Sequence, residues 1–464
     1  MSDDLGFLGA AELVKRYAAG TLSPPEVLEA CLAQIERHDD RLNAMAHVAA
    51  DSARVAARES AQRWAQGRPL GPLDGVPVAV KDLIPVAGMP LRYGSAASDD
   101  TPVDEDAPSV TNLRRAGAVI TGKTNTAEHG WKGVCDNPLT GITRNPWNPD
   151  LTPGGSSGGS GVAVATGMAA LALGGDEGGS IRIPSSFCGI AGLKPTWGRV
   201  PLHQPAVCGT WSHVGPMARC VADLALGLNA LAHPDPRDWE SLPETGTDYT
   251  ANLTQGVRGL RIALSPGIGH VALDGEVEAA VRAAAEVLRD LGATVVEATP
   301  AIGNPIEPYY VLVRMAARAI VDSVPASRRQ LLEGVLRKDA ADAGRHSGMD
   351  VKYAEMEQRR LGAVMASFFG NHDILLTATT AVPPFAVGID DPGNGKRTDL
   401  QWTGTLFPFN LTRLPAASVP CGRTASGLPI GLHLVAARYD DATVLRTAAA
   451  YEAAAPGIGR PPLA

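Results

Sequence analysis

The sequence LGGDEGGSIRIP occupies residues 173–184 and combines a glycine-rich turn with one serine, Ser180, after an acidic pair. The run Glu177-Gly178-Gly179-Ser180 can direct successive backbone N–H groups at one point, which is the arrangement that an oxyanion hole requires. The segment alone also fits a plain glycine turn whose serine caps the next element. A serine nucleophile needs a base, usually histidine. None of the ten histidines pairs obviously with this turn, so a base must come from elsewhere.

Lys81 is the candidate base. A lysine accepts a proton only when it is neutral, and burial away from carboxylates favours the neutral form. Lys81 ends the apolar run Val76–Val80, a short β-rich segment that we expect to carry it into the interior. The adjacent Asp82 should point to the opposite face of an extended chain. A structural role, in which Lys81 caps the strand and forms an ion pair, stays open.

A second glycine- and serine-rich stretch, TPGGSSGGSG at residues 152–161, leads directly into an apolar segment, Val162–Leu171, that we expect to be helical. Its composition also fits a flexible linker. However, glycines before a helix N-terminus leave amides free and let the backbone approach a ligand closely. We therefore predict a structured polar loop that presents the hydroxyl groups of Ser156 and Ser157.

Residues 117–124, GAVITGKT, match the phosphate-loop pattern GxxxxGKS/T. In a phosphate loop the residues between the glycines curl around the phosphate, whereas Ala-Val-Ile-Thr favours an extended strand. A helix should also follow Lys123 and Thr124, and residues 125–136 begin one weakly at best. We keep nucleotide binding as a remote alternative and predict that these glycines bound a strand.

The composition excludes several classes of function. A net charge of −8 and a pI near 5.7 leave no excess of cations to neutralise nucleic-acid phosphates. Six widely spaced cysteines without a CxxC pair suggest reduced thiols, and Glu128, His129, Cys135 and Asp136 follow no zinc spacing. The acidic N-terminus does not resemble a signal peptide, and the longest uncharged run has too short an apolar part to span a membrane. We expect a cytoplasmic protein.

Helical and strand patterns alternate along the chain, and no Pro/Gly/Ser linker divides it. In residues 109–123 and 260–297 a helix ends in glycine before a strand. The second segment also starts with a strand, so it is a β-α-β unit with parallel pairing. Residues 304–370 are helical, charged and irregular, which fits a lid or pocket wall outside the sheet.

Together these segments resemble the amidase signature family. The resemblance rests on the strand GPLDGVPVAVKD, the loop TPGGSSGGS, the glycine turn extended to Val200, and two later stretches, SHVGPMARCVADLA and LPAASVPCGRTASGLPIGLHLV. It runs from about residue 5 to 455 and is weakest across residues 304–370. It implies one α/β domain over residues 1–464, with a mixed, mostly parallel central sheet and helices on both faces. The expected parts are N-terminal helices (1–70), a catalytic core (71–230), the variable helical segment (304–370) and the end of the sheet (371–464).

The resemblance also implies a Ser-Ser-Lys triad, with Ser180 as nucleophile, Lys81 as base, and Ser156 as a proton relay on a cis peptide bond. The backbone N–H groups of residues 177–180 would form the oxyanion hole. Glu177 departs from the threonine or small apolar residue that the family often has there. Its carboxylate would discourage anionic substrates or raise the pKa of Lys81. Neither a cofactor nor a metal is implied.

The expected function is hydrolysis of a carboxylic amide, with aryl esters, anilides and carbamates (urethanes) open as further substrates. The alternative is the glutaminase-type A subunit of a tRNA-dependent amidotransferase. Residues 342–356 and 401–410 lack that subunit's arginine-rich and acidic patterns, so we favour a stand-alone amidase for a small molecule, which could be a homodimer. Aromatic residues that would contact an apolar substrate lie in segments that line the family's pocket, although core packing explains them equally well. They are Trp131, Tyr309, Tyr310, Trp402 and Phe407.

Overall fold

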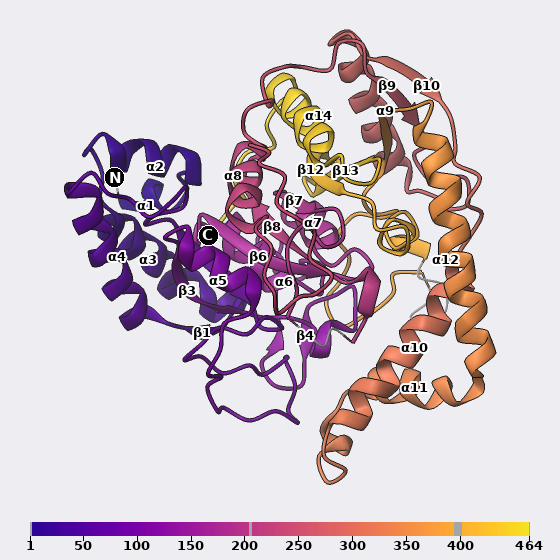
Figure 1. Cartoon of the computed structure of the whole chain (residues 1–464), viewed down its shortest axis with the longest axis horizontal. Coiled ribbons are helices and arrows are strands. Elements are labelled where there is room, and N and C mark those ends of the chain that lie inside the picture. Colours follow the sequence, from indigo (N-terminus) through magenta and orange to yellow (C-terminus); the bar gives the residue numbers. More distant parts are fainter. Residues whose placement is uncertain (1, 204–206, 394–400, 464) are drawn as a thin grey trace.

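An 11-stranded sheet runs through the molecule in the order β1-β3-β2-β6-β8-β7-β12-β13-β11-β9-β10 (Figure 1). The structure is a computed structural model that describes residues 2–203, 207–393 and 401–463. The strands of the sheet are β1 (Met45–Val48), β2 (Pro77–Lys81), β3 (Val119–Thr124), β6 (Leu171–Asp176), β7 (Ala191–Lys194), β8 (His213–Ala218), β9 (Arg261–Leu264), β10 (Thr294–Glu297), β11 (Ile374–Ala378), β12 (Ala416–Arg423) and β13 (Pro429–Ala436). A separate two-stranded ribbon pairs β4 (Asp136–Asn137) with β5 (Gly141–Ile142).

The sheet is mixed, as predicted, but it is not mostly parallel. Four neighbouring pairs are parallel, and they lie toward the two ends of the sheet. Six pairs are antiparallel. The strands β12 and β13 are joined by only residues 424–428, and so short a connection forces an antiparallel pair. The predicted β9-α9-β10 unit does pair in parallel.

Helices cover both faces of the sheet, because side chains alternate between the faces along each strand. Val78 and Leu173 belong to a core that includes residues of α8, α9 and α14. Ala79 and Ala172 point the other way, into a core with α6. The α-helices are α1 (Ser2–Leu5), α2 (Ala10–Ala18), α3 (Pro24–Leu42), α4 (Ala50–Ala65), α5 (Pro108–Arg115), α6 (Gly158–Ala165), α7 (Arg182–Cys188), α8 (Val221–Leu231), α9 (Gly275–Asp290), α10 (Ile306–Ser323), α11 (Gly334–Asp342), α12 (Gly348–Phe369), α13 (Pro408–Leu411) and α14 (Asp441–Ala454). Short 3-10 helices are η1 (Glu128–Gly130), η2 (Gly209–Trp211), η3 (Arg329–Leu331), η4 (Ala343–Arg345) and η5 (Gln401–Thr403).

The apolar segment Val162–Leu171 is helical only in its first part. The helix α6 starts earlier, at Gly158, and ends at Ala165. Gly167 then adopts a left-handed backbone conformation (φ 76°), and Leu171 already begins β6. The sequence prediction placed both boundaries too late, because glycines are usually read as breakers and here form the first turn of the helix.

The segment 304–370 contributes α10, α11 and α12, which lie on the opposite side of the molecule from the N-terminal helices (Figure 1). Its helices pack mainly on one another, and one apolar cluster joins Ala317, Ile320 and Leu336 to Trp131 of the catalytic core. The excursion is therefore attached to the wall of the site described below. Among the described helices, none combines the length and apolarity needed to cross a membrane.

Candidate active site

Lys81 is fully buried at the end of β2. Its ammonium nitrogen, Nζ, lies 2.7 Å from Ser156 Oγ and 3.3 Å from the carbonyl oxygen of Gly175. Asp82 points to the opposite face, as predicted, and forms a buried ion pair with Lys123 at 2.8 Å. Among the described residues Lys81 has no ion-pair partner, which removes the ion-pair role that the sequence left open.

The electrostatics of this position favour a neutral lysine. Burial lowers the pKa of Lys81, because the charged form loses its hydration. Glu177, Cys135 and Asp176 act in the opposite direction, but burial is the larger effect. A neutral lysine that already contacts a hydroxyl group can accept its proton.

The loop with Ser156 is a buried part of the core. Residues 152–160 are all buried, which rules out the flexible linker. The Gly155–Ser156 peptide bond is cis, as the resemblance implied. A Cβ atom on Gly155 would come within 2.2 Å of the carbonyl oxygen of Val134, so this approach requires glycine. The N–H of Ser157 donates to the carbonyl oxygen of Ser180 at 3.1 Å, which ties the loop to the glycine turn.

Ser180 follows β6 on the glycine turn and lines a cavity, with 7% of the residue exposed. Within the described chain, its backbone N–H and that of Gly178 have no hydrogen-bond acceptor, so both are available to a ligand. The N–H of Gly179 instead donates to Asp176 Oδ1 at 2.8 Å. It is already engaged within the protein, which weakens its place in the predicted oxyanion hole.

A buried network beneath the turn holds its shape. Asp176 accepts hydrogen bonds from the N–H groups of Gly179 and Ile181 and a two-pronged pair from the Arg182 guanidinium. Asn410 donates to Asp176 Oδ1 at 2.9 Å and accepts from Arg182 at 2.6 Å. Burial alone would raise the pKa of Asp176, but Arg182 outweighs it and the pKa is lowered. The carboxylate therefore stays ionised and fixes the backbone on both sides of Ser180.

Sequence reasoning missed this network. Its one local signal is Arg182, a charge in the otherwise apolar run that follows Ser180. Asn410 is 234 residues from Asp176 along the chain, so only the fold brings them together. Two histidines lie close by, His213 and His433, and burial lowers the pKa of each. Neither is hydrogen-bonded to Ser180 in the described structure.

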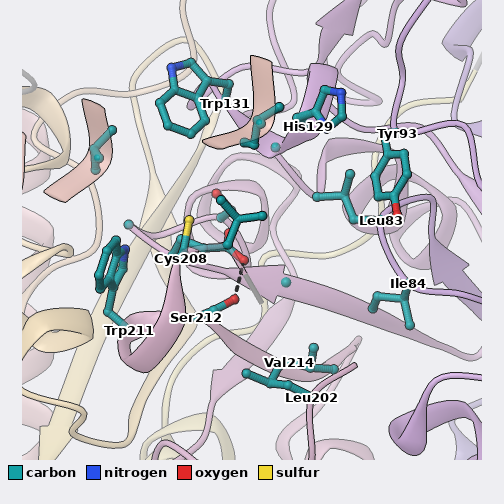
Figure 2. Close-up of a pocket in the computed structure, with 18 of the residues that line it drawn as sticks. Leu83, Ile84, Tyr93, His129, Trp131, Leu202, Cys208, Trp211, Ser212 and Val214 are labelled. Atoms are coloured by element: carbon teal, nitrogen blue, oxygen red, sulfur yellow. Dashed lines mark hydrogen bonds between the residues drawn. The ribbon is translucent and has the colours of Figure 1, made fainter. Parts of the chain in front are cut away.

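The cavity in front of Ser180 has a volume of about 260 Å³. Side chains from several segments converge on it, including Trp131, Trp211 and Tyr93 (Figure 2). Tyr93 stacks on His129, with ring centroids 5.1 Å apart, and burial lowers the pKa of His129 to about 4. The histidine is thus a neutral part of the wall at physiological pH, and no pattern in the sequence predicts that this pair lies there.

The predicted aromatic contacts divide into two groups. Trp131, Tyr309 and Tyr310 line the cavity. Trp402 does not: it stacks on Phe187 at 6.0 Å and meets Phe385 edge-on, so it belongs to the core behind the site. Phe407 also lies behind the wall, where it stacks on Tyr309 at 4.6 Å. For these two, the core-packing interpretation is the better one.

The phosphate-loop match is structural. Residues 119–124 form β3, as predicted, and the Lys123 side chain is buried in its ion pair with Asp82. The short 3-10 helix η1 follows where a phosphate loop would need a full helix. Among the residues that the structure describes, no group of three or more His, Cys, Asp or Glu side chains is arranged to hold a metal ion.

Comparisons with known proteins agree with this geometry. The family model described as "Amidase" matches residues 26–445. The chain is 38% identical to the A subunit of the glutamyl-tRNA(Gln) amidotransferase of Chloroflexus aurantiacus, over 94% of each chain. It is 37% identical to an acylamidase of Rhodococcus erythropolis, over 99% of this chain and 98% of that one. The crystal structure of a bacterial aryl acylamidase of the amidase signature family superposes with a TM-score of 0.91 at 32% identity, covering 97% of this chain and 96% of the other. The chain therefore belongs to the amidase signature family of amidohydrolases.

Proposed function

We propose that the protein is a stand-alone amidase that cleaves a carboxylic amide through an acyl-enzyme on Ser180, with Ser156 and Lys81 as relay and base. The observation that carries the proposal is the contact of 2.7 Å between Lys81 Nζ and Ser156 Oγ, made by a buried lysine without a carboxylate partner among the described residues. Ser180 lies on the adjoining turn and opens into the cavity.

The first half of the reaction forms the acyl-enzyme. Neutral Lys81 takes a proton from Ser156, which takes the proton of Ser180 as its oxygen attacks the amide carbon. The N–H groups of Gly178 and Ser180 stabilise the negative charge on the carbonyl oxygen, and that of Glu177 joins them in the proposed oxyanion hole. As the C–N bond breaks, the proton returns from Lys81 through Ser156 to the leaving amine.

The second half releases the acid. A water molecule gives a proton to the same relay and attacks the acyl carbon, and collapse of the intermediate restores the Ser180 hydroxyl. The aromatic wall of Trp131, Tyr309 and Tyr310 supports an apolar or aryl substrate. Aryl esters and carbamates present the same attackable carbonyl, so we include them among the proposed substrates.

A second candidate is the glutaminase subunit of an amidotransferase, because one of the compared relatives carries that name at 38% identity. Such a subunit should hydrolyse glutamine and associate with other chains. The stand-alone amidase should prefer simple amides or anilides and remain free of partners, as a monomer or a homodimer.

A substrate panel tests both candidates. Hydrolysis of an aliphatic amide, an anilide, an aryl ester, an aryl carbamate and glutamine is compared for wild type, Ser180→Ala and Ser109→Ala. Ser109 is a matched control, because it also lines the cavity but lies outside the triad. Turnover that only Ser180→Ala abolishes supports the hydrolase. Negligible rates in all three proteins, together with a larger complex by light scattering, would favour the partner-dependent subunit.

A further inference from the structure

We propose that Glu177 determines the charge selectivity of the active site: its carboxylate excludes amides that carry a negative group near the scissile carbonyl and admits neutral or cationic ones. This inference rests on the proposed function. It concerns the side chain of Glu177, whereas the oxyanion hole uses only the backbone of that residue.

The carboxylate of Glu177 is fixed beside the reacting groups. Glu177 lines the cavity directly after β6, and its Oε1 accepts a hydrogen bond of 2.8 Å from Ser212 Oγ, the dashed contact in Figure 2. A Cβ atom placed on Gly175 would lie 3.6 Å from this Oε1 and 3.7 Å from Lys81 Nζ. The carboxylate and the proposed base are thus near neighbours, and any substrate carbonyl between Ser180 and the wall approaches both.

No other group offsets this charge on the described cavity lining. Glu177 is its one acidic residue, and no arginine lines it. Lys132 is the one lysine of the lining, but three carboxylates surround its ammonium group, those of Asp136, Glu333 and Asp390. The lining histidines, His129 and His203, have pKa values lowered by burial and are neutral above them.

The surroundings strengthen the effect of this charge. Much of the lining is apolar, including Leu83, Ile84 and Val214, so the cavity screens charge poorly (Figure 2). A substrate carboxylate within several ångströms of Glu177 is repelled, a neutral aryl group is not, and an ammonium group is attracted. The selected substrates are therefore neutral or amine-bearing amides.

Three anilides of one scaffold test the inference, with a carboxylate, a methyl or a trimethylammonium group on the acyl side. Glu177→Gln removes the charge while its amide oxygen still accepts the Ser212 bond. Assays at about pH 9 keep even a buried carboxyl group ionised. Relative to the methyl compound, kcat/KM for the carboxylate should rise about tenfold in Glu177→Gln, and that for the cation should fall. A change in both ratios of less than about twofold would overturn the inference.

The matched control and a binding measurement separate this inference from the proposed function. Ser212→Ala keeps the charge but removes the hydrogen bond, so it should retain most of the wild-type selectivity. If wild type hydrolyses none of the anilides, the proposed function fails. Charge selectivity is then read from calorimetric affinities for the same compounds in Ser180→Ala and Ser180→Ala/Glu177→Gln. Equal ratios of affinity in the two proteins would overturn the inference independently of catalysis.

Discussion

At the scale of single residues, the protonation of Lys81 should set the pH dependence of the enzyme. Only the neutral lysine accepts a proton, and burial lowers its pKa below the usual value near 10.4. We predict that kcat/KM is high above the lowered pKa and falls about tenfold per pH unit below it. In Glu177→Gln this decline should move to lower pH, because the carboxylate that raises the pKa is gone. A profile measured with a neutral anilide checks both statements, and an unmoved or upward-shifted limb would contradict them.

The relay makes a second prediction about single residues. Lys81→Met and Ser156→Ala should each lower kcat by a factor on the order of 10³ or more, because the members of a proton relay act as a unit. The double variant should be little worse than either single variant. Steady-state kinetics with an anilide measure this, with Ser109→Ala as the control. Effects that multiply in the double variant would show that the two residues act separately.

Several of these residues could be predicted from sequence and others could not. The position of Lys81 followed from local facts, namely an apolar extended run and the alternation that turns Asp82 away. The contacts of Glu177 with Ser212 and of Asp176 with Asn410 bridge 35 and 234 residues. No local pattern encodes such distances, so these partners appear only when the sheet is assembled.

At the scale of elements, the ion pair between β2 and β3 should contribute strongly to stability. Lys123→Met leaves Asp82 as an unpaired buried carboxylate and should destabilise the fold by about 3–5 kcal/mol. Lys123→Met/Asp82→Asn should recover part of that loss, because no buried charge remains. Urea unfolding followed by fluorescence measures the difference. A loss below about 1 kcal/mol in the single variant, or an ATP-dependent stabilisation of wild type, would contradict the structural role.

The elements themselves were predictable where local chemistry is strong. Ser23 and Glu26 form the predicted capping box at the start of α3, with prolines in its first turn. The β9-α9-β10 unit followed from the periodicity of its helix and the glycine behind it. The extent of α6 did not follow, since tertiary packing places glycines inside a helix that their propensity disfavours.

At the scale of the whole molecule, the helical segment should affect substrate binding more than the chemical step. Trp131 of the cavity wall donates through Nε1 to Asp339 of α11 at 2.7 Å. Asp339→Ala should raise KM about three- to tenfold and change kcat less than about twofold, because the wall loosens while the triad stays intact. Asp322→Ala, which removes an exposed ion pair on α10, is the control and should change neither value. A selective fall in kcat for Asp339→Ala would contradict this division of roles.

The overall architecture was only partly accessible from sequence. One mixed sheet with helices on both faces was expected, but its antiparallel centre was not. Short connections reveal local hairpins such as β12–β13, whereas the pairing of β7 with β12 joins strands more than 200 residues apart. The same long-range pairing explains why Trp402 was placed on the cavity: the sequence shows an aromatic residue but not which side of the wall it faces.

The most direct test of the proposed mechanism is the detection of a covalent intermediate on Ser180. Wild type and Ser180→Ala are mixed with an activated aryl ester, quenched in acid within one turnover, and examined by mass spectrometry of the intact protein and its peptides. The mechanism predicts one added acyl group on wild type, located on Ser180, and none on the variant. An adduct on another residue, or turnover by Ser180→Ala at the wild-type rate, would contradict it.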